Sequence, residues 1–474
     1  FNTWHGTKMH GFPELLTEVL KDRMGFDGFV VGDWNAHGQV PGCSNDDCPT
    51  AINAGLDMLM APKDWKDLHG NTLKQVESGE IARERLDDAV RRILRVKMRA
   101  GLFELGKPSS RPMGTRADVV GSPEHRDVAR QAVRESLVML KNNGSVLPLA
   151  PGTHVLVAGD GADNITKQSG GWTITWQGTG NRNDEFPGGS SIWDGIRDTV
   201  ASAGGTATLS KKGKYDEKPD VAIVVFGEDP YAEYQGDRDS IDYSPGSDRD
   251  LRLLRRLGGD GIPVVSVFLT GRPLWVNPEL NASDAFVVAW LPGTEGRGVA
   301  EVLFADADGS VKYDFKGRLS FSWPRSVEQV VLNRGDAVYD PLFAYGYGMT
   351  YSESGDVAEQ SEEKVAVEQV SRTVYFQGGP VAPWQLFVGD SANPALSAAA
   401  GRVTTEGSEN LVIKSVDRRV QEDARSVEWS GGGSARVFLR AEAPIDLSRQ
   451  TDGNMVLAFD VMIDRAPEAQ VLLE

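Results

Sequence analysis

The chain has 474 residues, which is too long for one hydrophobic core, so we expect two to four domains. It carries 50 Lys and Arg against 68 Asp and Glu, a formal net charge of −18. This balance argues against a nucleic-acid partner, which needs a basic face, but it is compatible with a neutral substrate. No apolar run is long enough to predict a membrane-spanning helix, and nothing indicates the oligomeric state.

The first 105 residues are predicted to alternate helices with short strands. A helix is predicted over 13–24, a buried strand over 28–32, a second strand over 56–61 and a long amphipathic helix over 82–101. This order is typical of parallel α/β architecture. Because two strands cannot close a sheet, we expect residues 1–105 to be the C-terminal part of a (β/α)8 barrel, with the chain truncated at its N-terminal side.

The two cysteines, Cys43 and Cys48, lie within one loop, GCSNDDCPT. Zinc needs four ligands, and no nearby Cys or His cluster supplies the others. We therefore predict a disulfide that locks the loop. The alternative is a pair of free thiols in a cytosolic protein. A disulfide indicates an oxidising compartment, so we expect a secreted or periplasmic protein.

The rest of the chain is predicted to contain a linker, a second α/β domain and an all-β domain. Residues 106–150 read as a linker and a bridging helix that begins after Ser122. Residues 151–353 contain four apolar runs, typical of parallel strands buried on both faces. An acidic linker is predicted over 354–369, and 370–474 are predicted to form an all-β sandwich that is incomplete at its C-terminus.

Candidate site residues follow two of the predicted strands. Ligands of parallel α/β folds bind at the carboxyl ends of strands. Asp33 occupies such a position in GFVVGDW, and Glu233 lies in the carboxylate-rich loop 227–237. A further loop, GGWTITWQGTG, carries Trp172 and Trp176. Aromatic rings stack on pyranose rings and two carboxylates can share acid and nucleophile duties, so this combination favours a sugar site.

Each of these features also has a simpler interpretation. An Asp at a strand end is often a helix cap, a Glu-rich loop is usually solvated surface, and paired tryptophans often lie in a core. The segment VLVAGDGADN hints at nucleotide binding, but it lacks the third glycine of GxGxxG.

The combination of motifs decides between these interpretations. From residue 1 to 352 the chain contains, in this order, KMHG, GFDGFVVGDW, AGLDMLMAP, RILRVKMRAGLFE, EHRDVARQAVRESLVMLKN, GGWTITWQG, GEDPYAEYQGD, AWLPGTEGRGVAEVLF and YDPLFAYGYGMTY. The set resembles family 3 glycoside hydrolases, most closely the two-domain exo-β-glucanases and β-glucosidases. The resemblance implies a barrel followed by an (α/β)6 sandwich, with the active site between them and no metal or cofactor.

The resemblance also assigns roles to the two carboxylates. The Asp of the family's SDW-like motif is the nucleophile, so this role falls on Asp33. The second Glu of the GExPYxExxGD-like loop is the acid/base, which is Glu233 here. The implied activity is a retaining exo-acting hydrolase that releases glucose from the nonreducing ends of β-glucans or β-gluco-oligosaccharides, with 1,3 and/or 1,4 linkages.

Further positions are implied to bind substrate. Trp34 forms the wall of the +1 subsite and Trp176 faces it across the aglycone. Met60 approaches the nonreducing-end glucose, and Phe1 stands where some relatives carry a Tyr beside that sugar. Relatives often carry an Arg six residues after the nucleophile, where this chain has Gln39. The remaining ligands of the −1 sugar are expected upstream of this chain.

Three alternatives remain open at this point. Two are other activities of the same family, a β-N-acetylglucosaminidase and a β-xylosidase. The third is a carbohydrate-binding protein without catalytic activity, against which the presence of both carboxylates argues.

Overall fold

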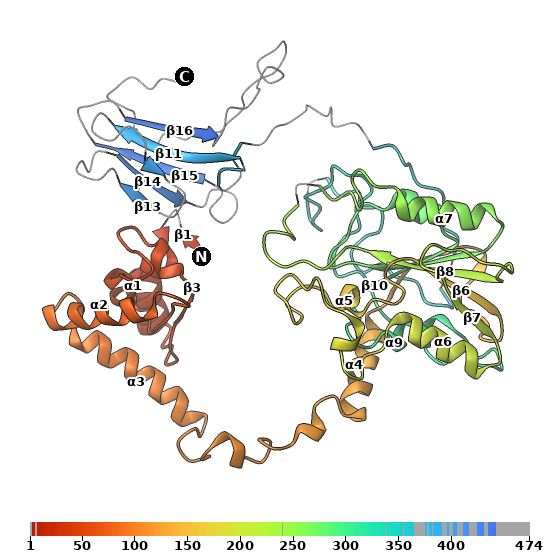
Figure 1. Ribbon diagram of the computed structural model, residues 1–474, viewed down its shortest axis with the longest axis horizontal. Coiled ribbons are helices and arrows are strands. Elements are labelled where there is room, and N and C mark those ends of the chain that lie inside the picture. The colour runs from red at the N-terminus through yellow and green to blue at the C-terminus, as the bar shows by residue number, and fades with distance from the viewer. Residues whose placement is uncertain are drawn as a thin grey trace, which may run out of the picture. The chain divides into compact units, whose positions relative to one another are not determined.

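The computed structural model divides the chain into two compact units, one formed by Phe1–Arg111 with Ser371–Glu474 and the other by Pro112–Val370 (Figure 1). The structure describes residues 2–4, 7–238, 240–336, 338–353, 355–364, 375–376, 379–381, 383–390, 396–397, 402–404, 411–416, 424–430 and 435–441.

The N-terminal region combines short strands with helices, as the sequence predicts. Its central feature is a parallel pair, β3 and β4, in which Val31 is opposite Met58 and Trp34 is opposite Met60. Its elements are β1 (Thr3–Trp4), β2 (Thr7–Lys8), a π-type helix (Glu14–Arg23), β3 (Val31–Trp34), α1 (Pro49–Ala54), β4 (Met58–Met60), α2 (Trp65–Ser78) and α3 (Arg83–Arg99).

Two features of this region differ from the prediction. The strand predicted as buried over 28–32 begins only at Val31, and both Val31 and Trp34 are exposed. The reason is that β3 pairs, among the described residues, with β4 alone. Helix α2 was not predicted, because its sequence WKDLHGNTLKQVES contains few apolar residues and buries only Leu68 and Gln75.

A buried ion cluster fixes the start of β3. The Asp57 carboxylate, which precedes β4, accepts hydrogen bonds from Val30 N (2.8 Å), Lys21 Nζ (2.9 Å) and the Arg85 guanidinium. Lys21 Nζ also donates to Gly55 O at 2.7 Å, and burial lowers the pKa of Lys21. The chain entering β3 is thereby tied to the chain entering β4.

The second unit is built around a six-stranded sheet, which confirms the predicted α/β fold. The strand order is β5-β10-β9-β8-β6-β7, and every neighbouring pair is parallel except β5 with β10. Strands β6, β8, β9 and β10 coincide with the four predicted apolar runs. The strands are β5 (Val138–Asn142), β6 (His154–Ala158), β7 (Thr206–Leu209), β8 (Val221–Gly227), β9 (Val264–Leu269) and β10 (Ala285–Trp290).

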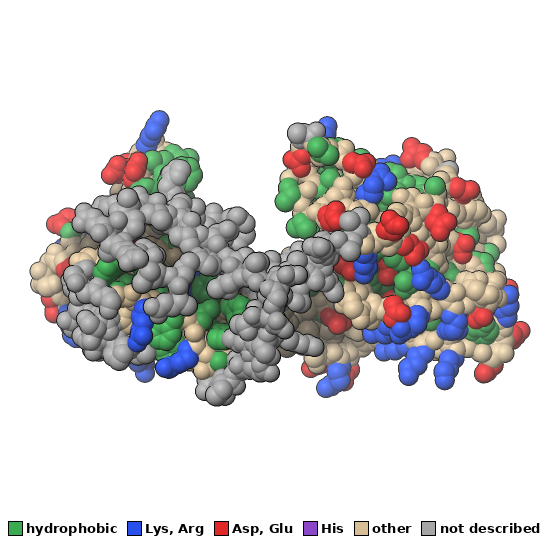
Figure 2. Space-filling model, turned by 90° about the horizontal axis from the view of Figure 1, so that it is seen from above, with side chains coloured by type: hydrophobic (Ala, Val, Ile, Leu, Met, Phe, Trp, Pro, Cys, Tyr) green, Lys and Arg blue, Asp and Glu red, His purple; other side chains and the backbone are tan. Residues whose placement is uncertain are grey.

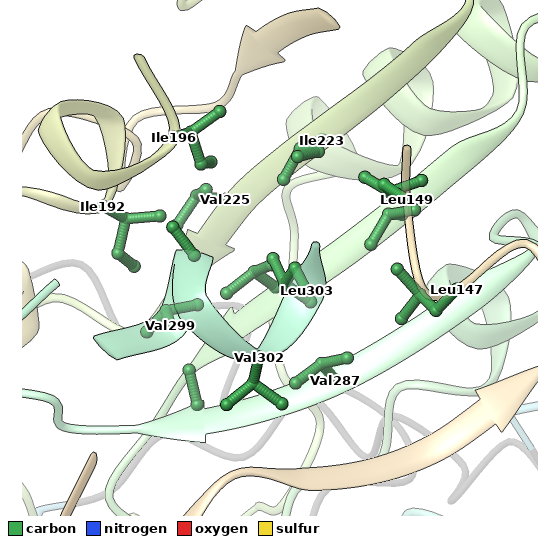
Figure 3. Close-up of a cluster of buried hydrophobic side chains, with 14 of the residues drawn as sticks. Leu147, Leu149, Ile192, Ile196, Ile223, Val225, Val287, Val299, Val302 and Leu303 are labelled. Atoms are coloured by element: carbon green, nitrogen blue, oxygen red, sulfur yellow. The ribbon is translucent and has the colours of Figure 1, made fainter. Parts of the chain in front are cut away.

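Helices cover both faces of this sheet (Figure 1). On one face lie α4 (Pro123–Ser136), α6 (Ile192–Ser202) and α9 (Arg297–Leu303), and on the other α7 (Arg249–Gly259) and α8 (Asn277–Asn281). Figure 3 shows the first layer, in which side chains of α6 and α9 pack against residues of the strands. The short helix α5 (Ile165–Ser169) follows β6.

The predicted boundary at residue 151 excludes part of this sheet. Ser122 caps α4, with its Oγ accepting from His125 N at 3.4 Å, but the helix ends at Ser136. Residues 138–142, predicted to continue the helix into a turn, form the edge strand β5 instead. All five are buried in the sheet, and an apolar run this short does not distinguish a strand from a helix. The four-residue strand β7, TATL, was missed because it is short, contains two threonines and is not fully buried.

Residues 355–364, predicted to be an acidic linker, pack on the second unit. The side-chain amide of Asn143 bonds both N and O of Val357, at 2.8 and 2.9 Å. The amide of Asn281 bonds N and O of Gln360 in the same way, both at 2.8 Å. Two asparagines therefore take the place of a neighbouring strand for this segment.

The C-terminal region consists of two three-stranded antiparallel sheets, ordered β12-β11-β16 and β13-β14-β15. Leu386 and Val388 of the first sheet form a buried cluster with Leu411 and Ile413 of the second, as expected of a β-sandwich. The strands are β11 (Trp384–Asp390), β12 (Leu396–Ser397), β13 (Arg402–Thr404), β14 (Leu411–Val416), β15 (Ala424–Trp429) and β16 (Ala435–Ala441).

Charged side chains of both signs are interspersed over the face of the second unit seen in Figure 2. In the part of the chain that the structure describes, every helix is too short or too polar to cross a lipid bilayer.

One buried carboxyl group makes the stability of the second unit depend on pH. Burial raises the pKa of Glu279, on α8, from 4.5 to about 7. The negative charges of Asp242 and Asp250 also raise this pKa, whereas the positive charge of Lys364 lowers it. Glu279 therefore keeps its proton in the folded state at pH values where the unfolded chain has lost it. Folding stability is lost as pH rises from 4.5 through 7, by up to about 3 kcal/mol.

We expect Glu279→Gln, which mimics the protonated group, to raise the free energy of unfolding relative to the parent at about pH 8 and to leave it nearly unchanged at about pH 4. Urea denaturation at the two pH values measures the difference, and the exposed Glu217→Gln serves as the control. An equal effect at both pH values would contradict the assignment.

Candidate active site

Asp33 lies near the end of β3, and its carboxylate is exposed. Its backbone N donates to His10 Nε2 at 3.0 Å, and its Oδ1 accepts from Trp34 N at 2.8 Å. Burial lowers the pKa of His10 to about 4, so the imidazole is neutral at neutral pH and Nε2 can accept this hydrogen bond. The backbone and the carboxylate of Asp33 are thus both held by local contacts.

An apolar surface lies beside Asp33. Trp34 and Met60 are register partners across β3 and β4, and Asn35 N donates to Met60 O at 3.0 Å. Both side chains are exposed, Trp34 by 60% and Met60 by 43%. The structure therefore brings together three of the predicted site residues.

The loop that follows this strand is closed by a disulfide between Cys43 and Cys48, with the sulfur atoms 2.12 Å apart. Cys48 is fully buried and directly precedes α1. From α2, Gln75 Nε2 donates to Asp47 Oδ1 at 2.7 Å. The loop after the predicted nucleophile is therefore anchored at both α1 and α2.

Gln39 and Phe1 are the remaining positions named from the resemblance. Gln39, where relatives often carry an Arg, accepts a hydrogen bond from the buried Lys8 Nζ at 3.1 Å. Phe1 lies outside the described residues.

Glu233 lies in the loop that follows β8, and it is exposed. Trp176 Nε1 donates to Glu233 Oε2 at 2.9 Å. The next residue, Gln177, bonds the backbone: its Oε1 accepts from Ala232 N at 2.7 Å and its Nε2 donates to Glu233 O at 3.0 Å. The predicted acid/base is thus held by the WQG motif at its carboxylate and at its backbone.

Exposed aromatic rings surround Glu233. The Trp172 and Trp176 rings are 6.1 Å apart and tilted, and the Tyr234 ring meets Trp176 edge-on at 6.0 Å. Trp172 and Trp176 are exposed by 71% and 47%, so these two tryptophans are not core residues.

Two glycines allow the loops 170–180 and 227–238 to pack without a gap. A Cβ at Gly171 would lie 2.0 Å from Tyr231 O, and one at Gly178 would lie 2.1 Å from Gly170 O. Gly178 also has φ +72°, which disfavours any other residue. Gly171 therefore allows the WQG loop to approach the acid/base loop closely, whereas Gly178 allows the WQG loop to close on itself at Gly170.

Glu228 anchors the Glu233 loop and is not itself accessible for catalysis. Its nearly buried carboxylate accepts from Arg272 Nε (3.1 Å), Arg238 Nη1 (3.2 Å) and Thr270 Oγ1 (2.7 Å). Arg272 also donates to Gly236 O at 2.7 Å, and its guanidinium lies 4.2 Å from the centre of the Tyr231 ring. Both ends of the loop are therefore tied to the end of β9.

The start of the loop is fixed by a buried lysine on α5. Lys167 Nζ lies 3.0 Å from Asp160 Oδ2 and 3.1 Å from Asp229 Oδ1, and it donates to Gly227 O at 3.0 Å. This contact also explains the role of the GDG segment after β6, whose Asp160 binds Lys167.

The predicted carboxylates belong to different units, Asp33 to the first and Glu233 to the second. Among the described residues, no group of three or more His, Cys, Asp or Glu side chains is arranged to hold a metal ion. Sequence reasoning missed His10 and Gln177 as supports of the site. Both lie within quoted motifs, KMHG and GGWTITWQG, but their partners are distant in sequence.

Comparison with known families gives three matches. Residues 1–96 match the glycosyl hydrolase family 3 N terminal domain and residues 137–351 match the C-terminal domain of the same family. Residues 382–474 match a galactose-binding domain-like family.

Individual proteins give the same result. The chain is similar to the crystal structure of an exo-1,3/1,4-beta-glucanase from a Pseudoalteromonas species, with 47% identity and a TM-score of 0.82 over 95% of this chain and 56% of that one. It is 31% identical to a lysosomal beta glucosidase of Dictyostelium discoideum over 73% of this chain and 45% of that protein. It is 30% identical to a periplasmic beta-glucosidase of Salmonella typhimurium, with coverages of 74% and 52%.

The chain thus spans about half the length of these curated relatives. Since the two domain matches together cover most of the chain, it belongs to glycosyl hydrolase family 3.

Proposed function

We propose that the protein carrying this chain is a retaining, exo-acting β-glucosidase or β-glucanase that removes glucose from the nonreducing ends of β-1,3- and/or β-1,4-linked glucans. The observation that carries the proposal is the 47% identity with an exo-1,3/1,4-beta-glucanase over nearly the whole chain. The exposed Asp33 and Glu233, each beside aromatic side chains, support it.

In the first chemical step, Asp33 acts as the nucleophile. One of its carboxylate oxygens attacks the anomeric carbon of the terminal glucose while the bond to the leaving oxygen breaks. Glu233 is protonated and gives its proton to that oxygen. The products are a glucosyl ester of Asp33 and the shortened sugar. This mechanism requires the two carboxyl groups to be roughly 5–5.5 Å apart.

In the second step, the ester is hydrolysed. Glu233, now a carboxylate, takes a proton from water, and the resulting oxygen nucleophile attacks the anomeric carbon and displaces Asp33. Two inversions at one carbon give β-glucose with overall retention. The enzyme is returned with Asp33 ionised and Glu233 protonated.

The aromatic side chains are proposed to bind the leaving-group sugar, which is the residue next to the terminal glucose in the substrate. Trp34 and Trp176 each present an exposed face next to a catalytic carboxylate, and such faces stack on pyranose rings. Met60, beside Trp34, supplies apolar contact for the glucose that is removed.

A secreted or periplasmic location is proposed as well. It is supported by the Cys43–Cys48 disulfide, since disulfides persist in oxidising compartments, and by the similarity to a periplasmic enzyme.

Asp33→Ala should abolish release of nitrophenol from an aryl β-glucoside by the native protein, with a loss of roughly 10⁴-fold or more, because no covalent intermediate can form. Asp67→Ala, an exposed aspartate on α2, is the matched control. Undiminished turnover by Asp33→Ala would rule out the nucleophile assignment. Faster hydrolysis of an aryl β-xyloside or N-acetylglucosaminide by the parent would instead select one of the other family activities.

Azide distinguishes the two carboxylates. Glu233→Ala should still form the glucosyl ester from dinitrophenyl β-glucoside, since this leaving group needs no proton, and azide should then release β-glucosyl azide from it without a general base. Asp33→Ala cannot give the β-azide, because that product requires the ester. Product anomers are read by NMR, and β-glucosyl azide from Asp33→Ala would reverse the assignment.

A further inference from the structure

The segment that carries Glu233 forms a turn with one unfavourable backbone conformation. Glu233 O accepts from Gln235 N at 3.0 Å, and Gly236 N donates to Ala232 O at 2.8 Å, so the backbone forms a tight turn. Tyr234, within this turn, has φ +72°, a left-handed conformation that is unfavourable for an aromatic residue. A contact from outside the turn therefore helps to keep the backbone of Glu233 in place.

Gln177 supplies that contact. Its side-chain amide bonds Ala232 N and Glu233 O together, at 2.7 and 3.0 Å. This pair of bonds spans the peptide that joins Ala232 to Glu233 and limits its rotation.

Gln177 is itself held rigidly. It lies between Trp176, whose O accepts from Trp172 N at 2.8 Å, and Gly178, which is buried and whose N donates to Thr175 O at 3.1 Å. The side chain that reaches across to Glu233 therefore starts from a fixed backbone.

We propose that Gln177 is a positioning residue that holds the backbone of the acid/base Glu233 in the orientation needed for proton donation. The inference rests on the proposed function. A positioning role differs from a role in folding because it predicts that the loss of catalytic rate depends on the leaving group of the substrate. Proton donation matters for a sugar or alkyl leaving group and hardly at all for dinitrophenolate.

The experiment compares Gln177→Met with the parent native protein on two substrates, a β-linked glucose disaccharide and 2,4-dinitrophenyl β-glucoside. The methionine keeps the volume of the side chain and removes both hydrogen bonds. We expect kcat/KM to fall about 10²-fold for the disaccharide and less than about 5-fold for the aryl glucoside. Gln131→Met, on the exposed face of α4, is the matched control and should change neither.

Gln177→Glu gives a second, independent readout. Below its carboxyl pKa, about 4.3 for an ordinary glutamate, the protonated side chain can accept from Ala232 N and donate to Glu233 O, as glutamine does. Above that pKa a carboxylate oxygen faces Glu233 O and repels it. The disaccharide rate of Gln177→Glu relative to the parent should therefore rise as pH falls from about 7 to about 4.

The outcomes separate the two proposals. If the parent hydrolyses both substrates but Gln177→Met slows both equally or neither, or if the relative rate of Gln177→Glu does not change with pH, the positioning role is overturned and the proposed function stands. If the parent hydrolyses neither substrate, the proposed function fails, and this inference fails with it.

Discussion

Buried ion pairs hold the backbone on which both predicted catalytic carboxylates lie. Asp57 joins Lys21, Arg85 and the amide that precedes β3, while Glu228 joins Arg272 and Arg238 beside the loop after β8. Removing one member of a fully buried pair such as Lys21–Asp57 costs about 3–5 kcal/mol, so the chain entering β3 is strongly tied to one conformation. The exposed carboxylates, Asp33 and Glu233, therefore need few packing contacts of their own and stay open to a ligand.

Much of the second unit could be predicted because local sequence determines it. Strands β6, β8, β9 and β10 are apolar runs that alternate with helical stretches, and this repeated alternation is typical of parallel strands buried on both faces. Strand β5 could not be recognised in this way, since VMLKN continues the apolar pattern of α4 and becomes a strand only by pairing with β10. Helix α2 was missed because contacts of Asn71 and Gln75 with the disulfide loop, rather than an apolar face, account for its place.

The candidate site, like the fold, could be predicted only where local sequence motifs determine it. Asp33, Trp34, Glu233 and Trp176 could be named because they lie in motifs that resemble those of a known family. The groups that hold them, His10 and Gln177, act across 23 and 56 residues of sequence. No periodicity or composition relates such positions. The same holds for Glu228, which in the sequence looks like one more solvent-exposed acid of the loop and in the structure is the anchor of that loop.

The loop 170–180 consists of a closely packed base around Gly171 and Gly178 and of residues between them that are exposed to solvent. A side chain at Gly171 would collide with Tyr231 O in the loop that carries Glu233, and a side chain at Gly178 would collide with Gly170 O in its own loop. Trp172 and Ile174, between them, extend into solvent with 71% and 63% of their surface exposed. Replacing Trp172 or Ile174 would therefore leave the packing at the two glycines intact, so the exposed surface of this loop can change its chemistry without moving its base.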